Sequence, residues 1–195
     1  MEGIYLIKDL KRLGIDSSWT LFLDRDGVIN KRIERDYVRE WSQFKFLPNT
    51  LDALRILKGI FGRIIVVTNQ RGIGRNLMTY QDLQLIHANM LEIVKKSGGR
   101  IDAVYYCPHD YEKGYCLCRK PNVGMAIQAK KDFPDIDFSK SVMVGDSLSD
   151  MDFGKRLGMV CVFVGGNVIG GEFFCFESLY EFAICLKEIC LHEKC

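Results

Sequence analysis

Short apolar runs alternate along the chain with longer segments in which apolar residues recur at helical spacing. A short apolar run bounded by polar turn residues is typical of a buried strand. We predict such strands at 20–23, 64–67, 103–106, 142–144 and 160–164. Because these strands alternate with helical segments, the pattern predicts βαβ units around a mostly parallel sheet.

The segments between the apolar runs carry helix start and stop signals. Asn49 or Thr50 can cap a helix that begins at residue 51. A capping pair of Thr79 and Asp82 opens a helix that includes 83–94 and that Gly98 stops. Further helices are predicted at 123–133, 150–157 and 179–189, and residues 4–7 allow one more strand.

The composition is that of one globular domain spanning residues 1–195. Apolar residues at 48% and charged residues at 27% are ordinary shares, so disorder is not indicated. A net charge of +2 is too small to favour a nucleic acid or a membrane surface as a partner. No signal peptide is recognisable and no apolar run approaches about 18 residues. We therefore expect a cytoplasmic protein whose cysteines are thiols or metal ligands.

Polar motifs follow the first four predicted strands, and they read "DRDG", "TNQRG", "CRKP" and "GDSLSD". Each motif alone is compatible with an ordinary turn or polar loop. Ligands of an open parallel sheet bind in the crevice beyond the carboxyl ends of its strands. Four such motifs in this order therefore predict one shared site.

These motifs resemble those of the haloacid dehalogenase superfamily of phosphotransferases over about residues 19–164. The matching residues are Asp24 with Asp26, Thr68, Lys120, and Asp146 with Asp150. More narrowly, "DRDGVIN", "VVTNQRGIGR" and "CPH" before "CLCRKP" look like a branch without a cap domain, which contains phosphatases of heptose 1,7-bisphosphate and of histidinol phosphate. The resemblance implies a Rossmann-like α/β fold with helices on both faces of the sheet. The absence of a large insertion between the motifs predicts that no cap is present.

The resemblance also implies a role for each matching residue. Asp24 is the expected nucleophile, which forms an aspartyl-phosphate, and Asp26 is the expected acid and base. Two like charges about 4 Å apart repel by about 4 kcal/mol at an effective dielectric near 20, so cations must offset the approach of a carboxylate to phosphate. We expect Mg²⁺ to be held by the side chains of Asp24 and Asp146 and by the carbonyl of Asp26. Lys120 would add a second cation, and Thr68 would donate a hydrogen bond to the phosphoryl group.

Four further residues of these motifs are expected to bind substrate, namely Asn69, Gln70, Arg75 and Arg119. For Arg75, a solvated position in a flexible loop is the alternative. Arg25 lies between the two aspartates and is expected to point away from the site. His87 falls within a helix and is expected to be an ordinary surface or boundary histidine rather than a ligand.

A second group of candidate ligands consists of Cys107, His109, Cys116 and Cys118. Three thiolates and one imidazole make a closed tetrahedral set for Zn²⁺ with no open position for water, which predicts a structural ion. The alternative is four unrelated reduced side chains. The other five cysteines lack this spacing and are expected to remain thiols.

The expected partner is a small phosphorylated metabolite, and no particular oligomeric state is implied. The leading prediction is removal of the 7-phosphate of a heptose 1,7-bisphosphate, because Lys31, Arg32 and Arg35 follow the catalytic loop and are suited to a second phosphate. A solvated charged loop is the alternative interpretation of this basic segment.

Two features favour other interpretations of the substrate. The six-residue gap between His109 and Cys116 is closer to the histidinol-phosphate phosphatases. Ser147 departs from both groups, which often carry a basic residue beside the last aspartate. A prediction of a different class is a zinc-stabilised nucleic-acid binding module, against which the near-neutral charge weighs.

Overall fold

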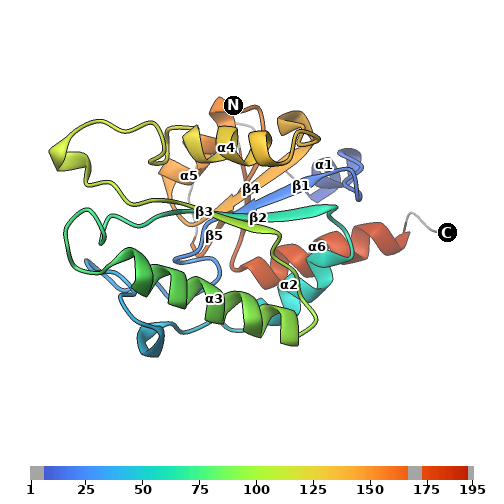
Figure 1. Cartoon of the computed structure of the whole chain (residues 1–195). Coiled ribbons are helices and arrows are strands. Elements are labelled where there is room, and N and C mark those ends of the chain that lie inside the picture. The colour runs from blue at the N-terminus through green and yellow to red at the C-terminus, as the bar shows by residue number, and fades with distance from the viewer. Residues whose placement is uncertain (1–6, 167–172, 193–195) are drawn as a thin grey trace.

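A six-stranded parallel sheet forms the centre of the protein (Figure 1). The structure is a computed structural model that describes residues 7–166 and 173–192. The strands are β1 Thr20–Leu23, β2 Arg63–Asn69, β3 Ala103–Cys107, β4 Ser141–Gly145, β5 Val160–Val164 and β6 Phe174–Phe176. Their order in space is β3-β2-β1-β4-β5-β6. The strand order therefore reverses between β1 and β4, which is where an open α/β sheet binds its ligand.

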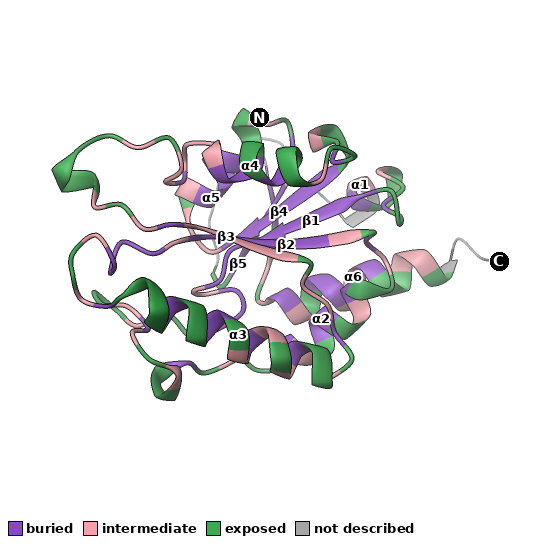
Figure 2. Ribbon diagram, viewed as in Figure 1, coloured by how far each residue is buried: buried purple, intermediate pink, exposed green. Residues whose placement is uncertain are grey.

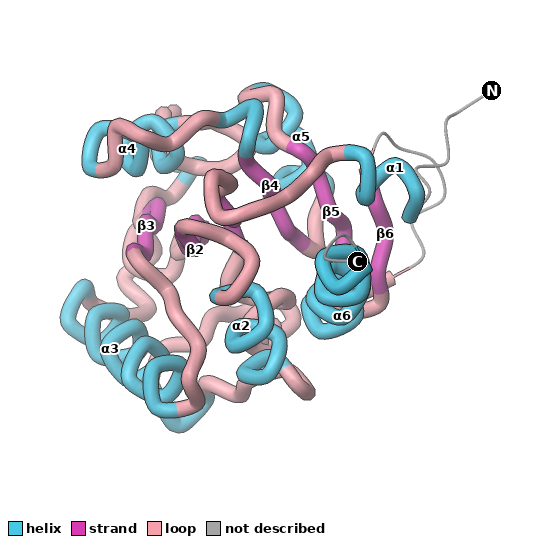
Figure 3. The backbone as a smooth tube through the Cα atoms, turned by 90° about the vertical axis from the view of Figure 1, so that its right-hand side faces the viewer, coloured by secondary structure: helices cyan, strands magenta, loops and turns pink. Residues whose placement is uncertain are grey.

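Helices cover both faces of this sheet (Figure 3). They are α1 Ile7–Arg12, α2 Thr50–Lys58, α3 Tyr80–Lys96, α4 Gly124–Asp132, α5 Leu148–Arg156 and α6 Leu179–His192. In both ribbon and tube views, α4 and α5 lie on one face, and α2, α3 and α6 lie on the other. Three short 3-10 turns are η1 Trp41–Gln43, η2 Tyr111–Lys113 and η3 Phe138–Lys140.

Alternate strand residues pack into separate hydrophobic clusters on the two faces. Leu21 belongs to the cluster that contains residues of α2, α3 and α6, whereas Phe22 belongs to the cluster that contains residues of α4 and α5. Both side chains are fully buried, as are most strand residues in Figure 2. Burial on both faces explains why these strands appear in the sequence as continuous apolar runs.

The five strands predicted from the sequence are all present, with small differences at their ends. β6 was not predicted, because a three-residue strand at the sheet edge leaves little pattern in the sequence. Residues 4–6 of the additional strand suggested for 4–7 lie outside the described residues, and Ile7 begins a helix instead. None of the described helices is long and apolar enough to cross a membrane.

The predicted helices are also present, and one of them starts earlier than expected. α5 begins at Leu148 rather than at Asp150, because Ser147 and Asp150 form a capping box at its start. The expected capping box of Thr79 and Asp82 opens α3. Asn49 precedes α2 in a left-handed conformation and makes no side-chain cap.

The connections at the carboxyl edge of the sheet contain little regular secondary structure. Within the described residues, the segment from β1 to α2 contains only η1, and the segment from β3 to α4 contains only η2. Neither segment therefore builds a separate layer over the edge of the sheet.

Leu57 tests how far the packing of α2 stabilises this arrangement, since it is fully buried against the α6 side of the core. We expect Leu57→Ala to lower the free energy of unfolding by about 2–5 kcal/mol, because it removes apolar contacts and leaves a cavity. Leu85→Ala is the matched control, because Leu85 on α3 is 59% exposed, and it should change stability by less than about 0.5 kcal/mol. Urea unfolding followed by circular dichroism measures both, and equal losses would contradict this account of the core.

Candidate active site

Asp24 lies directly after β1, at the point where the order of the strands reverses between β1 and β4. Its backbone N–H donates to the carbonyl of Val144 on β4 at 2.9 Å, which extends the strand pairing by one residue. Its Oδ1 accepts a hydrogen bond from the backbone N–H of Arg25 at 2.8 Å and lies 2.9 Å from Nζ of Lys120. The side chain is thus held by its Oδ1 atom in the lining of a cavity of about 500 Å³.

Lys120 joins two carboxylates inside the protein. Its Nζ lies 2.9 Å from Asp24 and 2.6 Å from Asp150, and it donates to the carbonyl of Val67 at 2.7 Å. Burial by itself would lower the pKa of Lys120, but the charges of Asp150 and Asp24 outweigh it and raise the pKa. The ammonium group therefore stays charged where it faces the expected nucleophile.

Three carboxylates crowd this point, since single oxygens of Asp24, Asp146 and Asp150 all lie within 4.8 Å of one another. Burial, together with the other carboxylates, raises the pKa of Asp24 to about 7, although Lys120 acts in the opposite direction. Burial likewise raises the pKa of Asp146 to about 6. A bound cation would stabilise the ionised forms of carboxylates whose pKa values are raised in this way. Hard oxygen ligands of this kind suit Mg²⁺.

Gly27 makes the close approach of the catalytic turn to Asp146 possible. A Cβ atom at Gly27 would lie 1.9 Å from Oδ2 of Asp146, and the φ of +94° is one that other residues rarely adopt. In this structure Nη2 of Arg32 lies 2.9 Å from Oδ1 of Asp146, so a positive charge already stands beside this carboxylate. The carboxylate oxygens gathered at this turn therefore make a donor set that fits a divalent cation.

Asp26 is held by donors on both of its carboxylate oxygens. Arg25 donates to Oδ1 and Oδ2 at 3.0 and 2.9 Å, Asn30 donates to Oδ1 at 2.8 Å, and Gln70 donates to Oδ2 at 2.8 Å. Burial would raise the pKa of Asp26, but the charge of Arg25 and these hydrogen bonds outweigh it and lower the pKa. Asp26 is therefore an ionised carboxylate in a fixed orientation.

The structure corrects two expectations about this turn. Arg25 does not point away from the site, since its fully buried guanidinium pairs with Asp26. His87 is buried as well, and its Nε2 lies 3.1 Å from Nη1 of Arg25. Burial and the charge of Arg25 lower the pKa of His87 to about 3, so the neutral ring accepts the hydrogen bond. The charged side chain of Arg25 can be buried here because it pairs with Asp26 and because neutral His87 accepts a further hydrogen bond from it.

The polar residues at the end of β2 and directly after it are hydrogen-bonded to protein groups, and Thr68 and Asn69 also line the cavity. Thr68 is buried and accepts a hydrogen bond from Gln70 at 2.9 Å. Gln70 is fully buried, and its amide also donates to Asp26, so its placement differs from that of a substrate ligand. Asn69 accepts from the backbone N–H of Lys120 and donates to its carbonyl, at 3.0 and 3.2 Å, which fixes the backbone that carries the lysine.

Basic residues from three connections line the same cavity, and they are Arg32, Arg35, Arg71, Arg75, Arg119 and Lys120. Arg75 and Arg119 were expected there from the sequence. Arg71 and Asn30 were not predicted as site residues, although both lie within motifs that the sequence marks. Ser147 also lines the cavity, and its hydroxyl caps α5 through Asp150.

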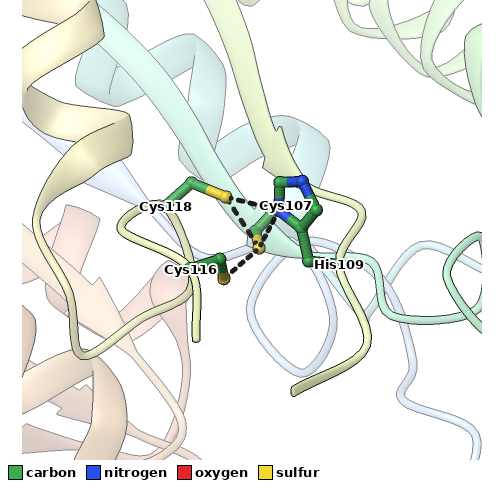
Figure 4. Close-up of side chains that lie close together, drawn as sticks. All are labelled: Cys107, His109, Cys116 and Cys118. Atoms are coloured by element: carbon green, nitrogen blue, oxygen red, sulfur yellow. Dashed lines mark hydrogen bonds between the residues drawn. The ribbon is translucent and has the colours of Figure 1, made fainter. Parts of the chain in front are cut away.

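The cysteine and histidine side chains of the predicted metal cluster converge beyond the end of β3 (Figure 4). Sγ of Cys107 lies 3.5 Å from Sγ of Cys116 and 2.9 Å from Sγ of Cys118. Nδ1 of His109 lies 3.1 Å from Sγ of Cys118. None of the cysteines in the described part of the chain forms a disulfide. The four atoms are therefore arranged as a compact set of ligands that could hold Zn²⁺.

Comparisons with known proteins agree with this geometry. Residues 117–172 match the HAD-hydrolase-like family. A D-glycero-alpha-D-manno-heptose-1,7-bisphosphate 7-phosphatase of Mycobacterium tuberculosis strain H37Rv is 40% identical over 172 residues, which are 85% of this chain and 90% of the relative. The D-glycero-beta-D-manno-heptose-1,7-bisphosphate 7-phosphatase of Escherichia coli strain K12 is 39% identical over 137 residues, covering 67% of this chain and 70% of the relative.

A solved structure with a similar fold is the D,D-heptose 1,7-bisphosphate phosphatase of B. bronchiseptica, complexed with magnesium and phosphate. It superposes with a TM-score of 0.76 at 28% identity, over 90% of this chain and 99% of that one. Fold, strand-end carboxylates and relatives thus agree on a hydrolase of the haloacid dehalogenase superfamily. Within that superfamily, the chain belongs to the family of the heptose-1,7-bisphosphate 7-phosphatases.

The buried contact between Arg25 and Asp26 can be tested by removing the charge of Arg25. We expect Arg25→Met to lower the free energy of unfolding by about 3 kcal/mol, because it leaves Asp26 and His87 without their main partner. Arg55→Met is the control, since Arg55 is 60% exposed and pairs with Asp52 on the surface of α2, and it should cost less than about 1 kcal/mol. Chemical unfolding of both variants measures the difference, and a small loss for Arg25→Met would argue against the buried pair.

Proposed function

We propose that this protein is a Mg²⁺-dependent phosphatase that removes the 7-phosphate of D-glycero-D-manno-heptose 1,7-bisphosphate. The observation that carries the proposal is that the buried carboxylate of Asp24 and several arginine side chains line one and the same cavity. The chain as a whole carries a net charge of only +2, so this concentration of positive charge is local. It suits a substrate with two phosphate groups better than one with a single phosphate.

In the first step, a carboxylate oxygen of Asp24 attacks phosphorus while the bond from phosphorus to the C7 oxygen of the sugar breaks. Asp26 in its protonated form gives its proton to that departing oxygen. Lys120 offsets the repulsion between Asp24 and the phosphate, because its ammonium lies 2.9 Å from the nucleophile. The product of this step is an aspartyl-phosphate on Asp24.

In the second step, water attacks phosphorus and gives its proton to Asp26, and the bond between phosphorus and Asp24 breaks. The observed contacts of Asp26 belong to its ionised form, which is the form that accepts this proton. The protonated form needed for the first step must give up one of the donors on its oxygens. Arg25, Asn30 and Gln70 therefore set how readily Asp26 changes between its two forms.

The metal site follows from the same residues. Asp24 and Asp146 would hold Mg²⁺ through their side chains, with the carbonyl of Asp26, and Arg32 would give up its contact with Asp146. When bound, the ion supplies positive charge to the phosphate oxygens and so assists the attack by the carboxylate. Asp150 serves Lys120 and the start of α5, so it supports the site from behind.

We also propose that Cys107, His109, Cys116 and Cys118 hold a structural Zn²⁺. Two residues after the last of these ligands, the chain reaches Lys120. The ion would therefore fix the loop that delivers the catalytic lysine, without taking part in the reaction itself.

The substrate proposal is tested by measuring phosphate release from both anomers of the heptose bisphosphate and from histidinol phosphate. The mycobacterial relative is named for the alpha anomer and the Escherichia coli relative for the beta anomer, so both are needed. We expect kcat/KM for one anomer to exceed that for histidinol phosphate by at least about tenfold, which corresponds to about 1.4 kcal/mol.

Two variants calibrate this assay. Asp24→Asn should lose nearly all turnover with an unchanged circular dichroism spectrum, whereas Asp152→Asn, at an exposed position on α5, should keep it. Preference for histidinol phosphate would overturn the substrate assignment and leave the chemistry intact. Substantial activity in Asp24→Asn would overturn the mechanism.

The zinc proposal is tested by elemental analysis of protein purified without added metal. We expect about one equivalent of zinc, together with activity that still requires added Mg²⁺. Cys116→Ser should lose the zinc and lower the melting temperature, because the loop before Lys120 is no longer held. Cys175→Ser, on the edge strand β6, is the control and should keep the zinc. A stable wild-type protein without zinc would refute the proposal.

A further inference from the structure

Two loops at the rim of the cavity are joined by a compact group of charged residues. Arg71, in the loop after β2, places Nε 2.6 Å from Asp110 and Nη2 2.7 Å from Glu112, both of which lie in the loop after β3. The two loops also touch through their backbones, since the N–H of Gly74 donates to the carbonyl of Pro108 at 2.9 Å. These contacts fix the position of the segment around η2 relative to β2.

The ring of Tyr111, within this fixed segment, lies beneath two guanidinium groups. The Cζ atom of Arg71 is 3.9 Å from the ring centroid, and that of Arg119 is 4.7 Å from it. Both arginines line the cavity that contains Asp24. An aromatic face attracts a guanidinium group and leaves the N–H groups at its edge available to other partners.

The two arginines differ in how far their charge is neutralised. Arg71 faces the carboxylates of Glu112 and Asp110, whose hydrogen bonds and charges raise its pKa although burial acts in the opposite direction. Arg119 forms no ion pair with any residue that the structure describes, and its Nη1 is buried without a hydrogen-bond partner there. Arg119 is therefore a partly buried cation without an anion, one residue before Lys120, and it is suited to bind a negatively charged group.

We propose that Tyr111 is a positioning residue that holds Arg119 toward the cavity, where Arg119 receives the phosphate of the sugar that is not hydrolysed. The inference rests on the proposed function and deepens it, because it names the group that makes the enzyme prefer a bisphosphate. Tyr111 itself does not touch the reacting atoms. Its ring supplies an aromatic face beside the guanidinium, with Cζ of Arg119 4.7 Å from the ring centroid, so that the paired N–H groups of Arg119 can bind two phosphate oxygens.

The test compares D-glycero-D-manno-heptose 1,7-bisphosphate with the corresponding 7-phosphate, which lacks the second phosphate. For Tyr111→Ala we expect KM for the bisphosphate to rise about five- to tenfold and kcat to change less than twofold. KM for the 7-phosphate should stay within twofold, because that substrate offers nothing to Arg119. Tyr111→Phe keeps the ring and should behave as the wild type.

Two controls separate positioning from damage to the loop. Tyr115→Ala removes a tyrosine from the same loop that is 80% exposed and does not line the cavity, so it should leave both KM values unchanged. In an Arg119→Ala background, Tyr111→Ala should raise KM for the bisphosphate no further, because the group it positions is gone. Zinc content and melting temperature of each variant show whether the loop is still folded.

The outcomes distinguish this inference from the proposed function. A wild-type enzyme that prefers the bisphosphate, with Tyr111→Ala indistinguishable from it, overturns only the role of Tyr111. An equal effect of Tyr111→Ala with and without Arg119 also overturns it. A wild type that hydrolyses both heptose compounds equally well removes the second-phosphate subsite, and one that hydrolyses neither overturns both proposals.

Discussion

The arrangement of the site depends on one buried ammonium group among carboxylates. Asp24, Asp146 and Asp150 would repel one another strongly if they were ionised with no cation nearby. Lys120 touches Asp24 and Asp150 and leaves Asp146 to Arg32 or to a metal ion. The negative charge that remains is concentrated where a divalent cation and a phosphate have to meet, which is why the chemistry is located at this end of the sheet.

The sheet supplies the rigidity that such a crowded site requires. β1 pairs with a parallel strand on each side, and the hydrogen bond from Asp24 to Val144 extends this pairing into the catalytic turn. Gly27 then lets the turn approach Asp146 without a side chain in between. Regular structure thus ends directly at the nucleophile, so the position of its carboxylate is set by the most buried part of the molecule.

Much of this could be predicted from the sequence, because buried parallel strands are continuous apolar runs and their polar ends carry recognisable motifs. The strands and the gathering of Asp24, Lys120 and Asp146 follow from those two signals. The contact of Arg25 with His87 could not be predicted, because it joins residues 62 positions apart and depends on how α3 packs. The inward orientation of Gln70 could not be predicted for a related reason, since only the fold shows that its amide donates to Asp26 and Thr68.

The contacts of Lys120 determine which basic residue can occupy this position. An ammonium group carries three hydrogens directed to the corners of a pyramid, and here the acceptors are Asp24, Asp150 and the carbonyl of Val67. A guanidinium group is flat and longer, so it cannot direct its hydrogens to three acceptors grouped around a single atom. Lysine and arginine, which replace each other freely on many protein surfaces, are therefore not interchangeable at this position, and the requirement is one of shape as much as of charge.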